Sequence, residues 1–118
     1  MADPELTKAF SEHHTKMIET NANVTRIQQQ IEDHKSTARS SQLTERVIVS
    51  LPEGTRLYES IGRLFVLTAA AEVKEHMKTN QEEAQQKIKQ LEKEKQTWET
   101  NLKQSEASIR ELVSQKRK

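Results

Sequence analysis

The segment RLYESIGRLFVLT, residues 56–68, is a compact apolar stretch in a chain that is otherwise mostly polar. Both glycines of the chain, Gly54 and Gly62, fall in this stretch or just before it. Over residues 55–67 the side chains alternate with a period of two, which is typical of a half-buried strand. Gly62 can adopt a positive φ, so we expect a tight turn at residues 61–63. The segment therefore predicts a β-hairpin over residues 55–67.

A single hairpin is only marginally stable in water and leaves two unpaired strand edges. The continuous apolar run over residues 64–67 also predicts cover on both faces of the second strand. Hairpins from several chains that join edge to edge into a sheet or a closed barrel would meet both needs. The alternative is a hairpin that only covers a helix turn within its own chain. The expected assembly residues are Leu57, Tyr58, Ile61, Gly62, Leu64, Phe65, Val66 and Leu67.

Long helices are expected on both sides of the hairpin. The composition is 32% hydrophobic and 31% charged, with only two Gly and two Pro, which suits long helices better than a globule or a disordered chain. Asp3 is a suitable cap and Pro4 a suitable first helical residue. We expect the first helix over residues 4–50 and the second over residues 68–116, with Thr68 as the cap of the second.

Apolar residues recur with alternating spacings of three and four along both helices, which predicts a two-helix antiparallel coiled coil. This line of contact residues, here called the seam, brings the two chain termini together. In the first helix its expected members are Leu6, Phe10, His13, Met17, Thr20, Val24, Ile27, Ile31 and His34. In the second helix they are Met77, Gln81, Ala84, Ile88, Leu91, Lys95, Trp98, Leu102, Ser105, Ile109 and Leu112.

Residues for catalysis or metal binding are not arranged in any known pattern. There is no cysteine, no phosphate-binding glycine loop and no nucleophile with a plausible base. His13 and His14 point about 100° apart on a helix, and no ligand cluster accompanies them. We therefore expect no enzyme activity, no cofactor and no metal. The basic end Lys116–Lys118 leaves open an adaptor that binds nucleic acid, although the net charge of +1 argues against such a partner.

The chain has no run of 18 apolar residues and no secretory signal pattern, so no membrane association is expected. The absence of cysteine fits a reducing compartment. We expect a soluble protein in the cytoplasm, and an additional nuclear location stays open.

The predicted order of elements is a helix, one β-hairpin and a second helix, with both termini at one end. This arrangement resembles a β-class subunit of the prefoldin family. The hairpin sequence YESIGRLF at residues 58–65 carries most of this resemblance. The stretches ELTKAF at residues 5–10 and SIREL at residues 108–112 also resemble the ends of such subunits, so the likeness covers essentially the whole chain. A single hairpin marks the β class, because the α class carries two.

The resemblance implies a mainly α-helical subunit whose hairpin contributes to an intersubunit β-barrel. It implies a heterohexamer in which two α-class and three further β-class chains accompany this one. Such a complex is an ATP-independent cochaperone that captures unfolded or nascent proteins, such as actin and tubulin, and delivers them to the cytosolic chaperonin. The residues that would hold these clients are Leu6, Phe10, Ile109, Leu112 and Val113.

Two alternatives remain at this stage. The terminal apolar residues would, in the simplest case, only close the coiled-coil seam. The second alternative is that the whole chain is a structural scaffold or adaptor that binds one folded partner.

Overall fold

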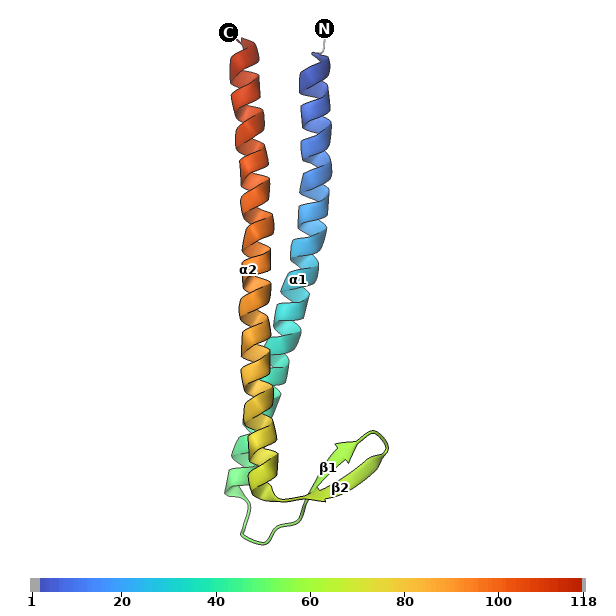
Figure 1. Ribbon diagram of the computed structural model, residues 1–118, viewed down its shortest axis with the longest axis vertical. Helices are drawn as coiled ribbons and strands as arrows, with labels where there is room; N and C mark the ends of the chain where they lie inside the picture. Colours follow the sequence, from blue (N-terminus) through green and yellow to red (C-terminus); the bar gives the residue numbers. More distant parts are fainter. Residues whose placement is uncertain (1–2, 118) are drawn as a thin grey trace. The chain divides into compact units, whose positions relative to one another are not determined.

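The computed structural model describes residues 3–117, and residues 1, 2 and 118, including the last residue of the basic end, lie outside this range. The elements follow in the order α1 (Pro4–Ser50), β1 (Leu57–Ile61), β2 (Leu64–Thr68) and α2 (Ala70–Arg117) (Figure 1). The helices contain 47 and 48 residues, against five in each strand. The predicted fold class, two long helices joined by one β-hairpin, is confirmed.

The strands β1 and β2 form an antiparallel two-stranded sheet in which Ile61 pairs with Leu64 and Leu57 with Thr68. Only two residues, Gly62 and Arg63, connect the strands. Gly62 has a φ of 60°, whereas no residue other than glycine has a positive φ in the described part of the chain. Glycine at the first central position with positive φ is the signature of a type II′ turn, whose twist suits a hairpin. The turn therefore forms where the sequence predicts it.

A second glycine turn separates α1 from the hairpin. The Thr55 amide donates a hydrogen bond to the Pro52 carbonyl at 3.3 Å, and Gly54 adopts a φ of 83° between them. Positive φ at the third turn position is a feature of type II turns, where glycine is favoured. α1 ends at Ser50, so this turn separates helix from strand without a long loop.

The expected cap at Thr68 is wrong. Thr68 is the last residue of β2, where it pairs with Leu57, and its hydroxyl donates to the Val66 carbonyl at 3.1 Å. The first helical hydrogen bond of α2 instead runs from the Val73 amide to the Ala69 carbonyl. Strand pairing therefore holds Thr68 in the sheet, and α2 begins at Ala70 rather than residue 68.

The start of α1 agrees with its sequence. The Asp3 carboxylate accepts a hydrogen bond from the Glu5 amide at 2.9 Å, and the Asp3 carbonyl accepts one from the Thr7 amide. Pro4 occupies the first helical position, where its missing amide hydrogen has no consequence.

The chain consists of two structural units. The first, here called the terminal unit, contains residues 3–31 and 90–117, and the second, the hairpin unit, contains residues 32–89. In the terminal unit a segment of α1 runs antiparallel to a segment of α2, as the paired positions 13 with 105 and 28 with 95 show. In the hairpin unit position 45 of α1 pairs with position 81 of α2. Each unit has its own buried seam. In the terminal unit the buried residues are Thr20, Ile27 and Ile31, and in the hairpin unit they are Ala38, Ser41, Ile48, Val73, Ala84 and Ile88.

The predicted seam of α2 is confirmed, because all eleven of its expected positions are buried or half-buried. In α1 one assignment is wrong. Phe10 is 51% exposed, and Ala9 is the half-buried residue at that level of the helix. Spacings of three and four fit either residue between Leu6 and His13, and the smaller side chain is the one that faces α2.

Polar residues that interrupt the seam meet partners on the opposite helix. In the terminal unit, His13 Nδ1 lies 2.9 Å from Ser105 Oγ, and Lys95 donates a hydrogen bond to Gln28 Oε1 at 3.0 Å. In the hairpin unit, Gln81 donates to Glu45 Oε2 at 2.8 Å. A half-buried polar group needs such a partner, so these pairs favour one alignment of the helices over alignments shifted by a heptad.

Candidate assembly and client-binding surfaces

The hairpin presents apolar side chains on both of its faces. Directly paired residues of an antiparallel sheet point to the same side. One side, the Phe65 face, carries Tyr58, Ser60, Phe65 and Leu67, and the other, the Glu59 face, carries Leu57, Glu59, Ile61, Leu64, Val66 and Thr68. Leu64 and Phe65 are 70% and 74% exposed, values that are unusual for large apolar side chains in an ordered strand.

The two faces differ in how much of them the chain covers. Leu57, Glu59 and Thr68 on the Glu59 face are half-buried, whereas every residue of the Phe65 face is exposed. The chain thus covers only the base of one face. The expected assembly residues therefore lie on an open surface, except for the half-buried Leu57, and Gly62 forms the turn at its end.

A contact between the hairpin and α2 contributes to the partial cover of the Glu59 face. His76 Nδ1 lies 2.7 Å from Glu59 Oε1. The hydrogen bond with this carboxylate raises the pKa of His76 above its ordinary value, and the negative charges of Glu59, Glu72 and Glu75 act in the same direction. Sequence reasoning missed this pair, because the two residues are 17 positions apart and belong to different elements.

The hairpin also has free strand edges. The sheet contains only β1 and β2, so each strand is paired along one side and unpaired along the other. Unpaired edges beside exposed apolar side chains accept further strands, and isolated hairpins of this length are barely stable. This surface is therefore suited to joining other strands.

The expected client-binding residues all lie in the terminal unit. Leu6, Ile109, Leu112 and Val113 are half-buried, whereas Phe10 is exposed. These residues come from the first two turns of α1 and the last turns of α2, which lie side by side in this unit (Figure 1). Four of them therefore take part in the helix contact, and Phe10 is the one whose ring is open to solvent.

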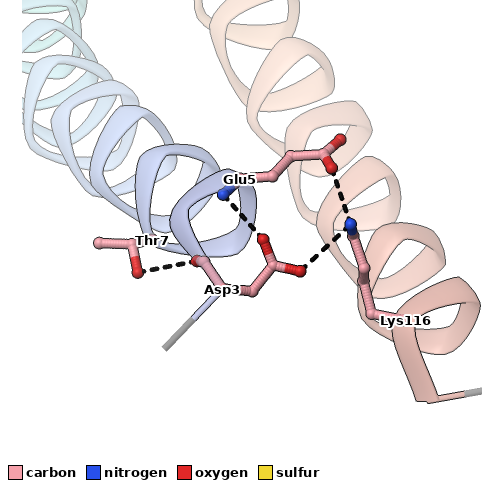
Figure 2. Close-up of polar contacts among 4 residues, drawn as sticks. All are labelled: Asp3, Glu5, Thr7 and Lys116. Carbon is pink, nitrogen blue, oxygen red and sulfur yellow. Dashed lines mark hydrogen bonds and ion pairs between the residues drawn. The ribbon is translucent and has the colours of Figure 1, made fainter. Parts of the chain in front are cut away.

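An ionic contact joins the two helix ends in the terminal unit (Figure 2). Lys116 Nζ lies 2.8 Å from Glu5 Oε2 and 3.1 Å from Asp3 Oδ2. Hydrogen bonds with Glu5 and Asp3 raise the pKa of Lys116, and the hydrogen bond with Lys116 lowers the pKa of Asp3. Lys116 therefore contacts two carboxylates of its own chain, which weakens the interpretation of the basic end as a nucleic-acid contact.

Trp98, an expected member of the seam, lies beside the small residue Thr20. Trp98, Leu102 and the buried Thr20 line one shallow groove between α1 and α2 in the terminal unit. The rim of this groove consists of polar and charged side chains, Lys16 and Glu19 among them. Threonine is much smaller than tryptophan, so the groove is explained by the pairing of a small and a large residue on the seam.

Within residues 3–117, no group of three or more His, Cys, Asp or Glu side chains is placed to hold a metal ion. His13 is half-buried and paired with Ser105, while His14 is exposed. In the same part of the chain, neither long helix is apolar enough to cross a membrane.

Comparisons with known proteins agree with this architecture. The model of the prefoldin subunit family matches residues 11–116. Prefoldin subunit 1 of Danio rerio is 38% identical over 115 residues, and that of Homo sapiens 36%, each covering 98% of this chain and 94% of the relative. Probable prefoldin subunit 1 of Caenorhabditis elegans is 33% identical over 118 residues, covering 99% of this chain and 100% of the relative.

Among solved structures, the crystal structure of the prefoldin beta subunit from Thermococcus strain KS-1 has a TM-score of 0.75. It is 18% identical, and the likeness covers 93% of each chain. The prefoldin beta2 subunit from the same strain has a TM-score of 0.65 at 19% identity, covering 85% of this chain and 98% of its own. At these identities the comparison shows a shared fold.

A two-helix coiled coil that carries one exposed, apolar β-hairpin defines a class of assembly subunit. The hairpin supplies unpaired strand edges, and the helices supply an extended contact surface. The chain belongs to the prefoldin subunit family, which is a family of chaperone subunits. Membership implies assembly with other prefoldin subunits, and the relatives reported above are subunit 1 proteins.

Proposed function

We propose that this chain is a β-class subunit of a heterohexameric, ATP-independent cochaperone, in which two α-class and three further β-class chains accompany it. The exposed apolar hairpin carries this proposal. Leu64 and Phe65 face solvent in the single chain, and both strands have an unpaired edge. Strands from neighbouring subunits would cover the side chains and pair the edges, as in a closed β-barrel.

The second part of the proposed function is the capture of unfolded or nascent proteins by the helix ends. Phe10 is exposed, and the half-buried Leu6, Ile109, Leu112 and Val113 lie close to the ends of their helices. Helix ends fray more easily than helix centres, so fraying would expose these four residues as well. Weak apolar contacts from six such subunits would add up to useful affinity for a non-native chain.

Family membership supports a proposal for the clients and for the receiving partner. We propose unfolded actin and tubulin as clients and the cytosolic chaperonin as the recipient, with the cytoplasm as the place of action. The proposed function requires no cofactor, because release of a weakly held client to a second chaperone needs only competition for the same apolar surface.

Native mass spectrometry of the tagged chain, purified gently from its own cells, tests the proposal. We expect a six-chain complex with one copy of this chain, two α-class subunits and three other β-class subunits. A homodimer, or a complex with a single folded partner, would contradict the proposed assembly and favour a scaffold protein. Addition of chemically unfolded actin to the purified complex should give a 1:1 adduct, which the purified chaperonin should then take up.

A further inference from the structure

The last part of α1 carries exposed apolar side chains that neither the seam nor the hairpin uses. Leu43 is 53% exposed and Val47 is 58% exposed, and both lie in ordered helix in the hairpin unit. Val49 and Leu51 next to them are exposed as well. We call Leu43 and Val47 the outer α1 pair.

The outer α1 pair lies on the side of the helix that is turned away from α2. Leu43 and Val47 are four residues apart, so they share one face of the helix. The seam at this level consists of Ser41, Glu45 and Ile48, of which two are buried and one is half-buried. At about 100° per residue, the outer pair points to roughly the opposite side of α1. No rearrangement of the coiled coil is therefore needed to bring a partner onto it.

The segment of α1 that carries the outer α1 pair contains no Lys and one Glu, and Arg39 and Arg46 lie one helical turn from Leu43. Residues 36–51 contain three charged side chains among sixteen, namely Arg39, Glu45 and Arg46. Residues 82–97 of α2, also sixteen, contain eight, namely Glu82, Glu83, Lys87, Lys89, Glu92, Lys93, Glu94 and Lys95. Depletion of Lys and Glu around apolar side chains is the composition of an interface core rather than of a solvated helix.

The size of the hairpin supports a protein neighbour of the same assembly. A stable protein interface typically uses about 20–30 residues from each partner. The two strands supply ten residues, and part of one face already packs on the chain itself. The outer α1 pair belongs to the same structural unit as the hairpin, and the exposed Val49 and Leu51 lie between the two along the chain.

We propose that the outer face of α1 at Leu43 and Val47 is a second subunit interface, which packs against a neighbouring prefoldin subunit in addition to the strand contacts of the hairpin. Such a neighbour exists only if the chain assembles as proposed above. The contact would be apolar and would lie on helix, so it would restrict the angle between adjacent subunits, which strand pairing at a single edge does not.

Thiol protection tests the second interface directly. The chain has no cysteine, so Leu43→Cys and Ile18→Cys each introduce its only thiol. Ile18 is the matched control, because it is 55% exposed on the same helix but lies in the terminal unit. Each variant is alkylated with iodoacetamide, as the isolated chain and in the purified client-free complex, and the labelled peptide of this chain is quantified by mass spectrometry.

We expect residue 43 to react about tenfold or more slowly in the complex than in the isolated chain, while residue 18 reacts at a similar rate in both. Equal reactivity of residue 43 in the two states would overturn the proposal. Protection that appears only after addition of unfolded actin or of the chaperonin would also overturn it, because the face would then bind a client or the recipient.

Two further variants separate this interface from the hairpin interface. Leu43→Glu with Val47→Glu should lower the yield of the six-chain complex, and Leu43→Ala with Val47→Ala should lower it less while preserving helix propensity. Ile18→Glu should leave the yield unchanged. A normal yield from both paired variants, with Phe65→Asp still abolishing assembly, would refute the second interface and leave the proposed function intact. Normal assembly of the Phe65→Asp variant as well would contradict the hairpin interface and with it the proposed function.

Discussion

Lys116 Nζ lies 3.1 Å from Asp3 Oδ2, so an ion pair connects the last turn of α2 with the residue that caps α1. A second pair to Glu5 extends this contact within the terminal unit. The terminal residues that we propose to bind clients therefore lie near solvent-exposed ion pairs, which dissolved salt can screen. Opening of this end should be sensitive to pH and ionic strength.

Replacement of Lys116 by Ala should loosen the helix ends. We expect the amides of the first turns of α1 to exchange with solvent faster, but only a few-fold, because exposed ion pairs contribute little. The control is Lys103→Ala, which removes another exposed lysine of α2. Hydrogen exchange measured by mass spectrometry checks the difference.

The pH dependence of the same contact has a definite sign. The pKa of Asp3 is lowered in the folded chain, mainly by its hydrogen bond with Lys116. Its contribution to stability is therefore present above the ordinary pKa of aspartate and is lost as the pH falls through the lowered value.

For the Lys116→Ala variant, an exchange rate equal to that of the unchanged chain at neutral pH and low salt would contradict the contact between Lys116 and Asp3.

Removal of buried seam contacts should destabilise the coil far more than removal of exposed ones. Ile27 is 1% exposed, so Ile27→Ala should lower the free energy of unfolding by about 2–5 kcal/mol. Ile18→Ala on the same helix should change it by no more than about 0.5 kcal/mol. Urea unfolding of the isolated chain, followed by circular dichroism, gives both values. Similar losses for the two variants would mean that Ile27 does not pack as described.

A charge on the open face of the hairpin should prevent assembly without unfolding the helices. Phe65→Asp places a carboxylate where we propose that a neighbouring strand packs, whereas Arg63→Asp places one in the turn, outside both strands. We expect loss of the six-chain complex for Phe65→Asp alone, with the helical signal of both variants largely kept. Loss of most helicity in the Phe65→Asp monomer would show that the hairpin stabilises its own helices instead.

Client capture should depend on the apolar residues at the helix ends and not on exposed apolar residues in general. Phe10→Ser combined with Val113→Ser should leave the complex intact and weaken its suppression of actin aggregation during dilution from denaturant. Ile18→Ser removes an apolar side chain of similar exposure to Phe10 and should have little effect. Unchanged suppression by the double variant would refute the role of the helix ends.

The contact between the hairpin and α2 should titrate with His76. The hydrogen bond with Glu59 is the main cause of the raised pKa of His76, so Glu59→Gln should lower that pKa towards its ordinary value. Glu72→Gln removes a more distant charge and should lower it less. An NMR titration of the His76 ring checks both variants.

Because the pKa of His76 is raised on folding, its pairing stabilises the fold fully below about pH 6.5, and this contribution is lost as the pH rises through the raised value. A His76 pKa that does not respond to Glu59→Gln would contradict the pair.

The seam shows what the sequence predicts and where periodicity is insufficient. In α2 large apolar residues such as Ile88 and Leu91 repeat regularly, and the predicted seam agrees with the structure. In α1 the buried Ala38 and Ser41 extend the seam, but small residues occur equally on solvated helix faces, so they give no clear signal. The same ambiguity explains Phe10 and Ala9, since both fit the spacing and only packing against α2 selects between them.

The hairpin could be predicted from the sequence because glycine and proline mark its limits. The contacts that the hairpin and the neighbouring part of α1 make could not be predicted in this way. Gly62 indicates the turn from conformational preference alone. Two features depend on how separate elements approach one another, which the spacing of residues in the sequence does not encode. They are the contact between Glu59 and His76 and the exposure of the outer face of α1. The spacing of Leu43 and Val47 was nonetheless a usable signal, because two apolar residues four apart on a face opposite the seam need an explanation.

The exposed sheet of the single chain also has a consequence for copies of the protein that remain unassembled in the cell. A copy made in excess of its neighbours keeps Phe65 and two unpaired strand edges exposed, and such surfaces promote aggregation. A surplus copy that no neighbouring subunit covers is therefore expected to aggregate or to be degraded.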